Sequence, residues 1–212
     1  YRIMKEKRFA GLKGYSTSLS MIKRNRIIAV LLLISVMGSF YYAVTTYLPL
    51  YLTDNRGLGL SEDVASWVPT ASSTSALIIA LFVVPRLKSR SGYIKALTLG
   101  YGIGCASILL LIYSPKGFLP LALVSGVLLG FYYGTAFSVS RTFLTNEIEA
   151  IDSRTRAKIL SITLTLSSLI NLPSPTLAGY LFSLEPKLPF IVLSVTLIIS
   201  LATLLFATRK RH

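Results

Sequence analysis

The sequence predicts an all-α, polytopic membrane protein with six transmembrane helices, and three observations lead to this class. Hydrophobic residues make up 53% of the chain and charged residues only 14%, a composition typical of membrane proteins. Six apolar stretches follow one another, each about as long as the ~20 residues that a transmembrane helix needs. Basic residues gather at the ends of these stretches, so the net charge of +14 indicates membrane topology more than nucleic-acid binding.

The first predicted span covers residues 27–52, a stretch without a charged residue that follows the basic run 23–26. At ~1.5 Å of rise per residue it is long enough to cross a membrane, and its basic flank is expected to stay in the cytoplasm. Four polar residues recur in it at spacings of four, three and four and so share one face of the helix: Ser35, Ser39, Tyr42 and Thr46. This polar face predicts contact with something other than lipid.

Basic segments flank the membrane domain at both ends. Residues 1–26 are expected to form a cytoplasmic linker on the anionic surface of the membrane, and residues 209–212 a short cytoplasmic tail. No signal peptide is recognisable, because this first segment is basic and lacks an apolar stretch. Since the chain starts at Tyr1, we expect it to be a piece of a longer protein.

Five further spans complete a membrane domain that is predicted to extend over residues 27–208. They cover residues 64–84, 96–115, 117–140, 159–184 and 188–208. Glycines four residues apart in the third and fourth spans predict close helix packing: Gly100 and Gly104, and Gly126, Gly130 and Gly134. The fifth span contains Pro173 and Pro175, which remove backbone hydrogen bonds, so a kink is expected there.

The distribution of Lys and Arg sets the predicted orientation. Of the 22 basic residues in the chain, all but Arg56, Lys116 and Lys187 fall in segments predicted to be cytoplasmic. Such an asymmetry follows the positive-inside rule for a chain that crosses the membrane an even number of times. We therefore expect a multi-pass protein of the cell membrane with both termini in the cytoplasm.

Two stretches resemble a known family. Residues 154–157, RTRA, enter a Ser/Thr-rich helix that ends with PSPTLAGYL at residues 173–181; this is similar to the R-x-R-A … G-P-x-x-A-G-x-L pattern in the eleventh helix of major facilitator superfamily transporters. The turn over residues 85–92, PRLKSRSG, is similar to the family's D-R-x-G-R loop but lacks its Asp, so no gating role is carried over to it. With its six-span rhythm, the chain resembles the C-terminal half of such a transporter.

The resemblance implies half of a twelve-helix fold, with the six spans as helices seven to twelve. It implies that the first, second, fourth and fifth spans face a central cavity, and that the third and sixth face lipid. The sequence agrees with this arrangement, because the sixth span is rich in Leu, Ile and Val and contains no charged residue. The residues expected to line the cavity are hydroxyl, amide and aromatic groups: Ser39, Tyr42, Thr46, Thr70, Ser73, Tyr133, Phe137 and Asn171.

Two groups of residues are candidates for conformational control. Pro173 and Pro175 form either a moving kink or a static bend. Arg141, Arg154 and Arg156 are expected in the cytoplasmic loop after the fourth span. There they either lock a closed state by pairing with the acidic residues of the loop or are simply solvated.

The function that follows is secondary active transport of a small molecule by alternating access. Export of a drug-like compound is favoured by similarity to the drug-exporter branches of the family. Uptake of a sugar or another organic solute is an alternative, because the candidate side chains suit either solute and no fixed charge marks an ion site. A non-transporting six-helix bundle, such as a receptor or an assembly subunit, is a further alternative. An intramembrane enzyme is not expected, because no predicted span contains His, Asp or Glu.

The expected partners are the lipid bilayer, the small-molecule substrate with a coupled proton, and a missing N-terminal six-helix half. No cofactor, metal or nucleic acid is expected. Proton coupling usually depends on an ionisable group at membrane depth, and the predicted spans contain none. We therefore expect the coupling carboxylate to lie in the missing half.

Overall fold

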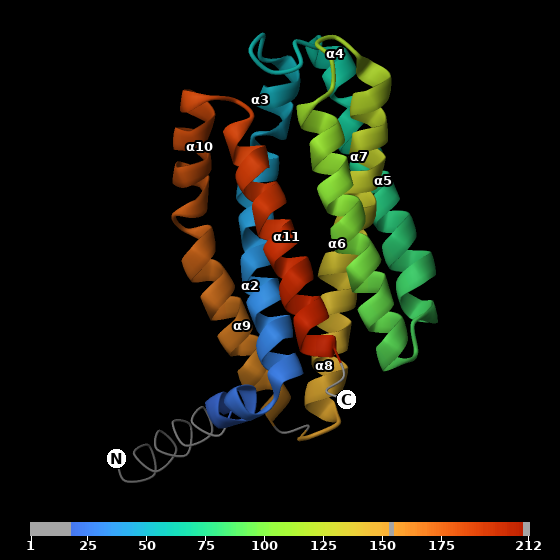
Figure 1. Cartoon of the computed structure of the whole chain (residues 1–212), viewed down its shortest axis with the longest axis vertical. Helices are drawn as coiled ribbons and strands as arrows, with labels where there is room; N and C mark the ends of the chain where they lie inside the picture. The colour runs from blue at the N-terminus through green and yellow to red at the C-terminus, as the bar shows by residue number, and fades with distance from the viewer. Residues whose placement is uncertain (1–17, 153–154, 210–212) are drawn as a thin grey trace, which may run out of the picture.

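The computed structural model describes residues 18–152 and 155–209, and all regular secondary structure in these ranges is helical. The long helices run up and down along one axis of the molecule (Figure 1). Within these described ranges, five helical segments are long and apolar enough to cross a membrane. The predicted class, an all-α polytopic membrane protein, is thereby confirmed.

The first predicted span is built from two helices. Asn25 caps α2 (Arg26–Thr46). Its Oδ1 accepts hydrogen bonds from the backbone N–H groups of Ile27 and Ile28, at 3.0 and 3.2 Å. The chain then turns at Tyr47 and continues as α3 (Leu48–Thr53). Because Pro49 has no N–H to donate to the preceding turn, the helix breaks at this point.

The second span is a single apolar segment whose helical type changes along its length. It comprises α4 (Glu62–Ala65), α5 (Trp67–Ile78), the π-helix η1 (Ile79–Val83) and the 3₁₀-helix η2 (Val84–Arg86). After a short turn, Ser89 caps α6 (Arg90–Ile112) by accepting a hydrogen bond from the Gly92 N–H at 3.0 Å. Helix α6 thus begins six residues before the predicted span, which started at residue 96.

The fourth span is a long helix of three parts: α7 (Leu119–Tyr133), the π-helix η3 (Gly134–Val139) and α8 (Ser140–Glu149). The predicted span ended at residue 140, so the helix continues nine residues further. Arg141 therefore belongs to a helix, and its expected place in a loop was wrong. The fifth span breaks at Leu172 and Pro173 into α9 (Arg156–Asn171) and α10 (Ser174–Leu184), and α11 (Leu188–Thr208) is the sixth.

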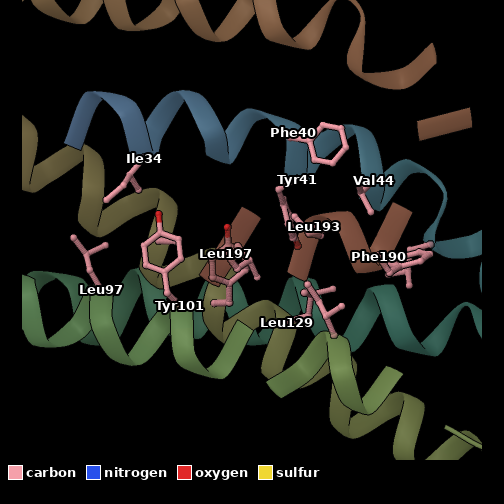
Figure 2. Packing of buried hydrophobic residues seen from close by; sticks show 14 of the residues in the cluster. Ile34, Phe40, Tyr41, Val44, Leu97, Tyr101, Leu129, Phe190, Leu193 and Leu197 are labelled. Carbon is pink, nitrogen blue, oxygen red and sulfur yellow. The ribbon is translucent and has the colours of Figure 1, made fainter. Parts of the chain in front are cut away.

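The hydrophobic core lies where α2, α6, α7 and α11 meet. Helix α6 packs between α7 and α11, and α2 packs against α9 and α11. Figure 2 shows Ile34 of α2 facing Leu97 and Tyr101 of α6, with Leu197 of α11 beside them. These side chains are almost fully buried, so the bundle has an apolar centre although its outer surface is also apolar.

Glycines bring α5 and α7 into backbone contact. A Cβ at Gly130 would lie 2.0 Å from the carbonyl oxygen of Ser72 on α5. A Cβ at Gly126 or Gly134 would lie 2.8 Å from another carbonyl oxygen of α5. Helix α6 approaches in the same way, because a Cβ at Gly104 would lie 2.7 Å from the Tyr132 ring. The close packing predicted from the four-residue glycine spacing is thus present.

The two ends of the bundle differ in charge. We call the end that carries Arg26, Arg86, Arg156 and Arg209 the basic end, and the opposite end, with the turns around residues 54–61 and 114–118, the loop end (Figure 1). At the basic end, the Arg26 guanidinium donates to the Phe206 carbonyl oxygen at 2.9 Å and lies 4.5 Å from the centre of the Phe206 ring. This contact ties the first span to the last.

Candidate functional site

One cavity lies between α2, the α7–η3–α8 helix and α9, and we call it the α2–α9 cavity. Its volume is about 260 Å³. Three kinds of group line it: an aromatic wall, a row of hydroxyl and amide side chains, and one cation. Such a mixture of apolar surface and a few polar groups is typical of sites for small organic molecules.

The aromatic wall comes mainly from α2 and α7. The Tyr133 ring stacks on Tyr41 at 5.3 Å and on Phe137 at 5.7 Å between ring centroids. Tyr42 meets the edge of Tyr133, and the two hydroxyl groups form a hydrogen bond of 2.8 Å. Behind them Tyr132 contacts both Tyr41 and Tyr101. Because each ring is held by at least one other, the wall is preorganised for contact with an apolar or aromatic ligand.

One face of α9 supplies the polar row. Thr163, Ser167, Ser168 and Asn171 line the cavity at spacings of four, one and three residues, so they lie on neighbouring parts of one helical face. Thr163 donates its hydroxyl to the Ile159 carbonyl at 2.9 Å. The side chains of the other three make no hydrogen bond within the described part of the chain, and they are therefore available to a ligand.

Arg141 is the cation of the α2–α9 cavity. It lies on α8 one turn beyond Phe137. None of the ion pairs among residues 18–152 and 155–209 includes it, nor does any hydrogen bond within those ranges. The expectation that no fixed charge marks an ion site was therefore wrong, because the extended fourth helix carries this charge into the cavity.

A second cavity, of about 500 Å³, opens between α2, α5 and α7, and we call it the α2–α5 cavity. Tyr42 and Tyr133 line both cavities, so their hydrogen-bonded pair lies at the partition between them. Ser72 and Ser73 contribute from α5. The α2–α5 cavity is larger than the α2–α9 cavity, and none of its described lining residues is charged.

The structure brings most of the predicted cavity residues together. The α2–α9 cavity is lined by Ser39, Tyr42, Tyr133, Phe137 and Asn171, and the α2–α5 cavity by Ser73. Thr46 and Thr70 line neither cavity. Each donates its hydroxyl to the carbonyl four residues earlier, Thr46 at 2.9 Å and Thr70 at 2.9 Å, as hydroxyl side chains in membrane helices often do.

The residues considered for conformational control lie in different places. Pro173 and Pro175 flank the start of α10, next to the break in the fifth span. Arg156 forms an ion pair with Glu149, and Arg90 pairs with Glu147 at 3.2 Å, so charge pairing does occur at the basic end. Arg154 lies outside the described residues.

Several lining residues were missed by the sequence analysis. Tyr101 belongs to the third span, which was expected to face lipid, yet its ring is buried and forms part of the cavity wall. Ser167 and Ser168 were also missed, although their spacing from Asn171 was a usable signal. In the described part of the chain, no three His, Cys, Asp or Glu side chains gather to hold a metal ion.

Comparison with known families agrees with this architecture. A family model described as Major Facilitator Superfamily matches residues 4–169 and, in an overlapping match, residues 55–212. The comparison with curated proteins gave no match. Because the family matches together cover nearly the whole chain, and because its apolar helices form a polytopic bundle, the chain belongs to the major facilitator superfamily of membrane transporters.

Proposed function

We propose that the chain forms one half of a secondary active transporter that exports small, amphipathic, drug-like molecules by alternating access. The observation that carries the proposal is the α2–α9 cavity, in which a wall of stacked rings faces unpaired hydroxyl and amide groups. This surface contacts an apolar body and hydrogen-bonds a polar group at the same time. Its large aromatic area favours a drug-like solute over a sugar.

A second six-helix unit is proposed to cover the open side of both cavities. Large apolar side chains on α5 and α9 are exposed beside the cavities, among them Leu77, Leu164 and Leu169. In transporters of this class the substrate site lies near the membrane midplane between two related halves that rock against each other. The unit named here therefore supplies one wall of the site, and proton coupling is assigned to the other half.

The orientation is proposed from the charge of the two ends. The basic end is placed in the cytoplasm, together with the linker over residues 1–26 and the tail over residues 209–212. In a Cys105→Ala background, Lys187→Cys should react with a membrane-impermeant thiol reagent added outside intact cells, and Ser89→Cys should not. Gly57 is a poor labelling site, because a Cβ there would lie 2.1 Å from the Tyr51 carbonyl oxygen. Labelling of Ser89→Cys alone would invert the orientation.

Transport itself is tested with the native protein in cells exposed to a panel of fluorescent drug-like compounds. Export predicts lower steady-state accumulation with the protein than without it, and dissipation of the proton gradient should abolish the difference. Asn171→Ala should weaken the export of compounds that carry a hydrogen-bond acceptor, because the amide faces the cavity without a partner. Thr196→Ala, on the sixth span and outside both cavities, is the matched control. Higher accumulation with the protein would instead indicate uptake.

A further inference from the structure

Arg141 occupies an unusual position for a basic residue of this chain. The Ser35 and Ser140 hydroxyl oxygens are 3.3 Å apart, which places the start of α8 beside Ser35 of α2. Ser35 follows Arg26 by nine residues, or about 13 Å of helix. Arg141 therefore lies inward of the basic end, within the candidate membrane span Leu119–Glu149, and its exposed side chain borders the cavity. Charged residues within such spans are usually kept for function.

The surroundings of Arg141 contain no acidic partner. None of the described residues that line the α2–α9 cavity is acidic. The nearest acids on the same helix, Glu147 and Glu149, are paired with Arg90 and Arg156. Glu147 also lies six residues, or about 9 Å, farther along the helix toward the basic end. The cation thus faces the cavity with its charge uncompensated by the described part of the chain.

From this geometry we propose that the α2–α9 cavity binds an organic anion, a carboxylate or a similar oxyanion carried on an aromatic body, with the anionic group on Arg141. A guanidinium group donates two parallel hydrogen bonds to such an oxyanion. The inference rests on the proposed transport function and names the class of substrate for the same cavity.

The arrangement of the cavity also sets the shape of this ligand. Phe137 is one helical turn from Arg141, and Tyr133 is two turns away, or about 12 Å along the helix. Ser167, Ser168 and Asn171 face the cavity from α9 without partners. An anion on Arg141 therefore places an attached ring against the aromatic wall, while neutral donors from α9 meet its remaining polar atoms.

The competing role for Arg141 is that of a topogenic charge, like the other basic residues of this end. The two roles predict different effects of substitution. A topogenic charge acts on insertion and affects all ligands alike. A ligand-binding charge discriminates between an anion and a neutral molecule of the same size. A pair of matched probes therefore separates them.

The test uses the native protein in lipid nanodiscs, with 2-naphthylacetate as the anionic probe and 2-naphthylacetamide as its neutral match. Binding is measured by the ligand-induced shift in unfolding temperature and by equilibrium binding. The acetate should bind at least 10-fold more tightly than the amide. Arg141→Gln should weaken acetate binding by about 10- to 100-fold, as expected for loss of a charge-assisted hydrogen bond, and weaken amide binding much less, because the amide carries no charge. Arg141→Lys should retain part of the preference.

The matched control is Arg86→Gln, which removes an exposed charge at the basic end outside both cavities and should leave both affinities unchanged. Equal affinities of the two probes for the unmodified protein, no binding of the acetate at millimolar concentration, or equal losses in Arg86→Gln and Arg141→Gln would overturn the anion site. A transport assay in proteoliposomes distinguishes failure of the anion site from failure of the proposed transport function. Transport of neutral compounds without anion preference leaves the proposed function standing, whereas no transport of any compound by the unmodified protein contradicts the proposed function itself.

Discussion

The two halves of the fourth span, the helix from Leu119 to Glu149, have opposite surroundings. In its first half, Gly126 and Gly130 bring the backbone into contact with α5, and no space remains for a methyl group. In its second half, Phe137 and Arg141 project into a cavity of about 260 Å³. The π-helix η3 lies at the transition between these two regions. Such π-bulges within α-helices are frequent at functional sites.

One helix thus serves both as scaffold and as site. We call the contact of Gly126, Gly130 and Gly134 with α5 the glycine seam. It packs α5 and α7 tightly together, so the aromatic residues that follow are presented from a rigid element. Across the cavity, α9 belongs to a span that is broken at Leu172 and Pro173, and most of its side chains are exposed. We therefore expect substitutions in the seam to change stability, and those around the cavity to change binding and transport.

The seam should show the largest effect. Gly130→Ala places a Cβ against the Ser72 carbonyl oxygen, a backbone atom that cannot turn aside. We expect it to lower the free energy of unfolding by ~1–3 kcal/mol, seen as a lower unfolding temperature in detergent. Gly102→Ala is the matched control on α6, since nothing lies within 4 Å of a Cβ there, and it should be neutral or stabilising because alanine favours helix. Equal effects of the two changes on the unfolding temperature would show that the close packing at Gly130 does not determine stability.

The broken fifth span should show the next effect, on transport rate. Replacing Pro173 and Pro175 by Ala allows α9 and α10 to join as one helix, so substrate exchange should slow several-fold while the folded protein still reaches the membrane and binds substrate. Pro189→Ala, at the start of α11, is a control of the same chemistry outside both cavities. Unchanged exchange in the double variant would identify the break as a static bend.

The partition between the cavities should show a smaller effect. The hydrogen bond between Tyr42 and Tyr133 is expected to contribute ~0.5–1.5 kcal/mol. A double-mutant cycle with Tyr42→Phe and Tyr133→Phe should therefore be non-additive in substrate binding or in unfolding. Tyr113→Phe, on an exposed ring at the loop end, supplies the additive reference. Additivity of the Tyr42 and Tyr133 changes would show that the two hydroxyl groups act independently.

The ion pairs of the basic end should show the smallest effect. Each of the two ion pairs has a partly exposed member, Arg90 in the pair with Glu147 and Glu149 in the pair with Arg156. Glu147→Gln and Glu149→Gln should therefore each change the free energy of unfolding by no more than ~1 kcal/mol. Proton-driven transport by the native protein should keep its dependence on pH in both variants. Loss of that dependence with substrate binding intact would place the coupling group in this unit.

The parts of this molecule that depend on local pattern were predictable from the sequence. The positions of the apolar helices, the glycine contacts and the break near Pro173 all follow from composition and spacing. The polar face of α2 was also predicted, but Thr46 lies outside both cavities, at the last residue of α2 before the break that Pro49 causes. A break that depends on one proline is hard to place inside an otherwise continuous apolar run.

Two features depend on tertiary contacts and were not predicted. Arg141 ends an apolar run, so hydropathy placed it in a loop, whereas packing against α2 and α6 and the pairing of Glu147 with Arg90 continue the helix past it. Tyr101 stands in an apolar helix without a periodic polar pattern, and its place in the wall follows only from its contact with Tyr132. These are the residues for which a neighbour, not a local spacing, decides the environment.

If the α2–α9 cavity is the substrate site that opens in turn to the two sides of the membrane, Ser168→Cys in a Cys105→Ala background should be accessible from both. Ser168 is an exposed, unpaired residue of the cavity lining. In sealed membranes of the native protein, a membrane-impermeant thiol reagent should label it from each side of the membrane, and substrate should slow the labelling from both. Ile198→Cys on α11, exposed but outside the cavities, should stay unlabelled. Labelling of Ser168→Cys from one side alone, with no effect of substrate, would contradict the account.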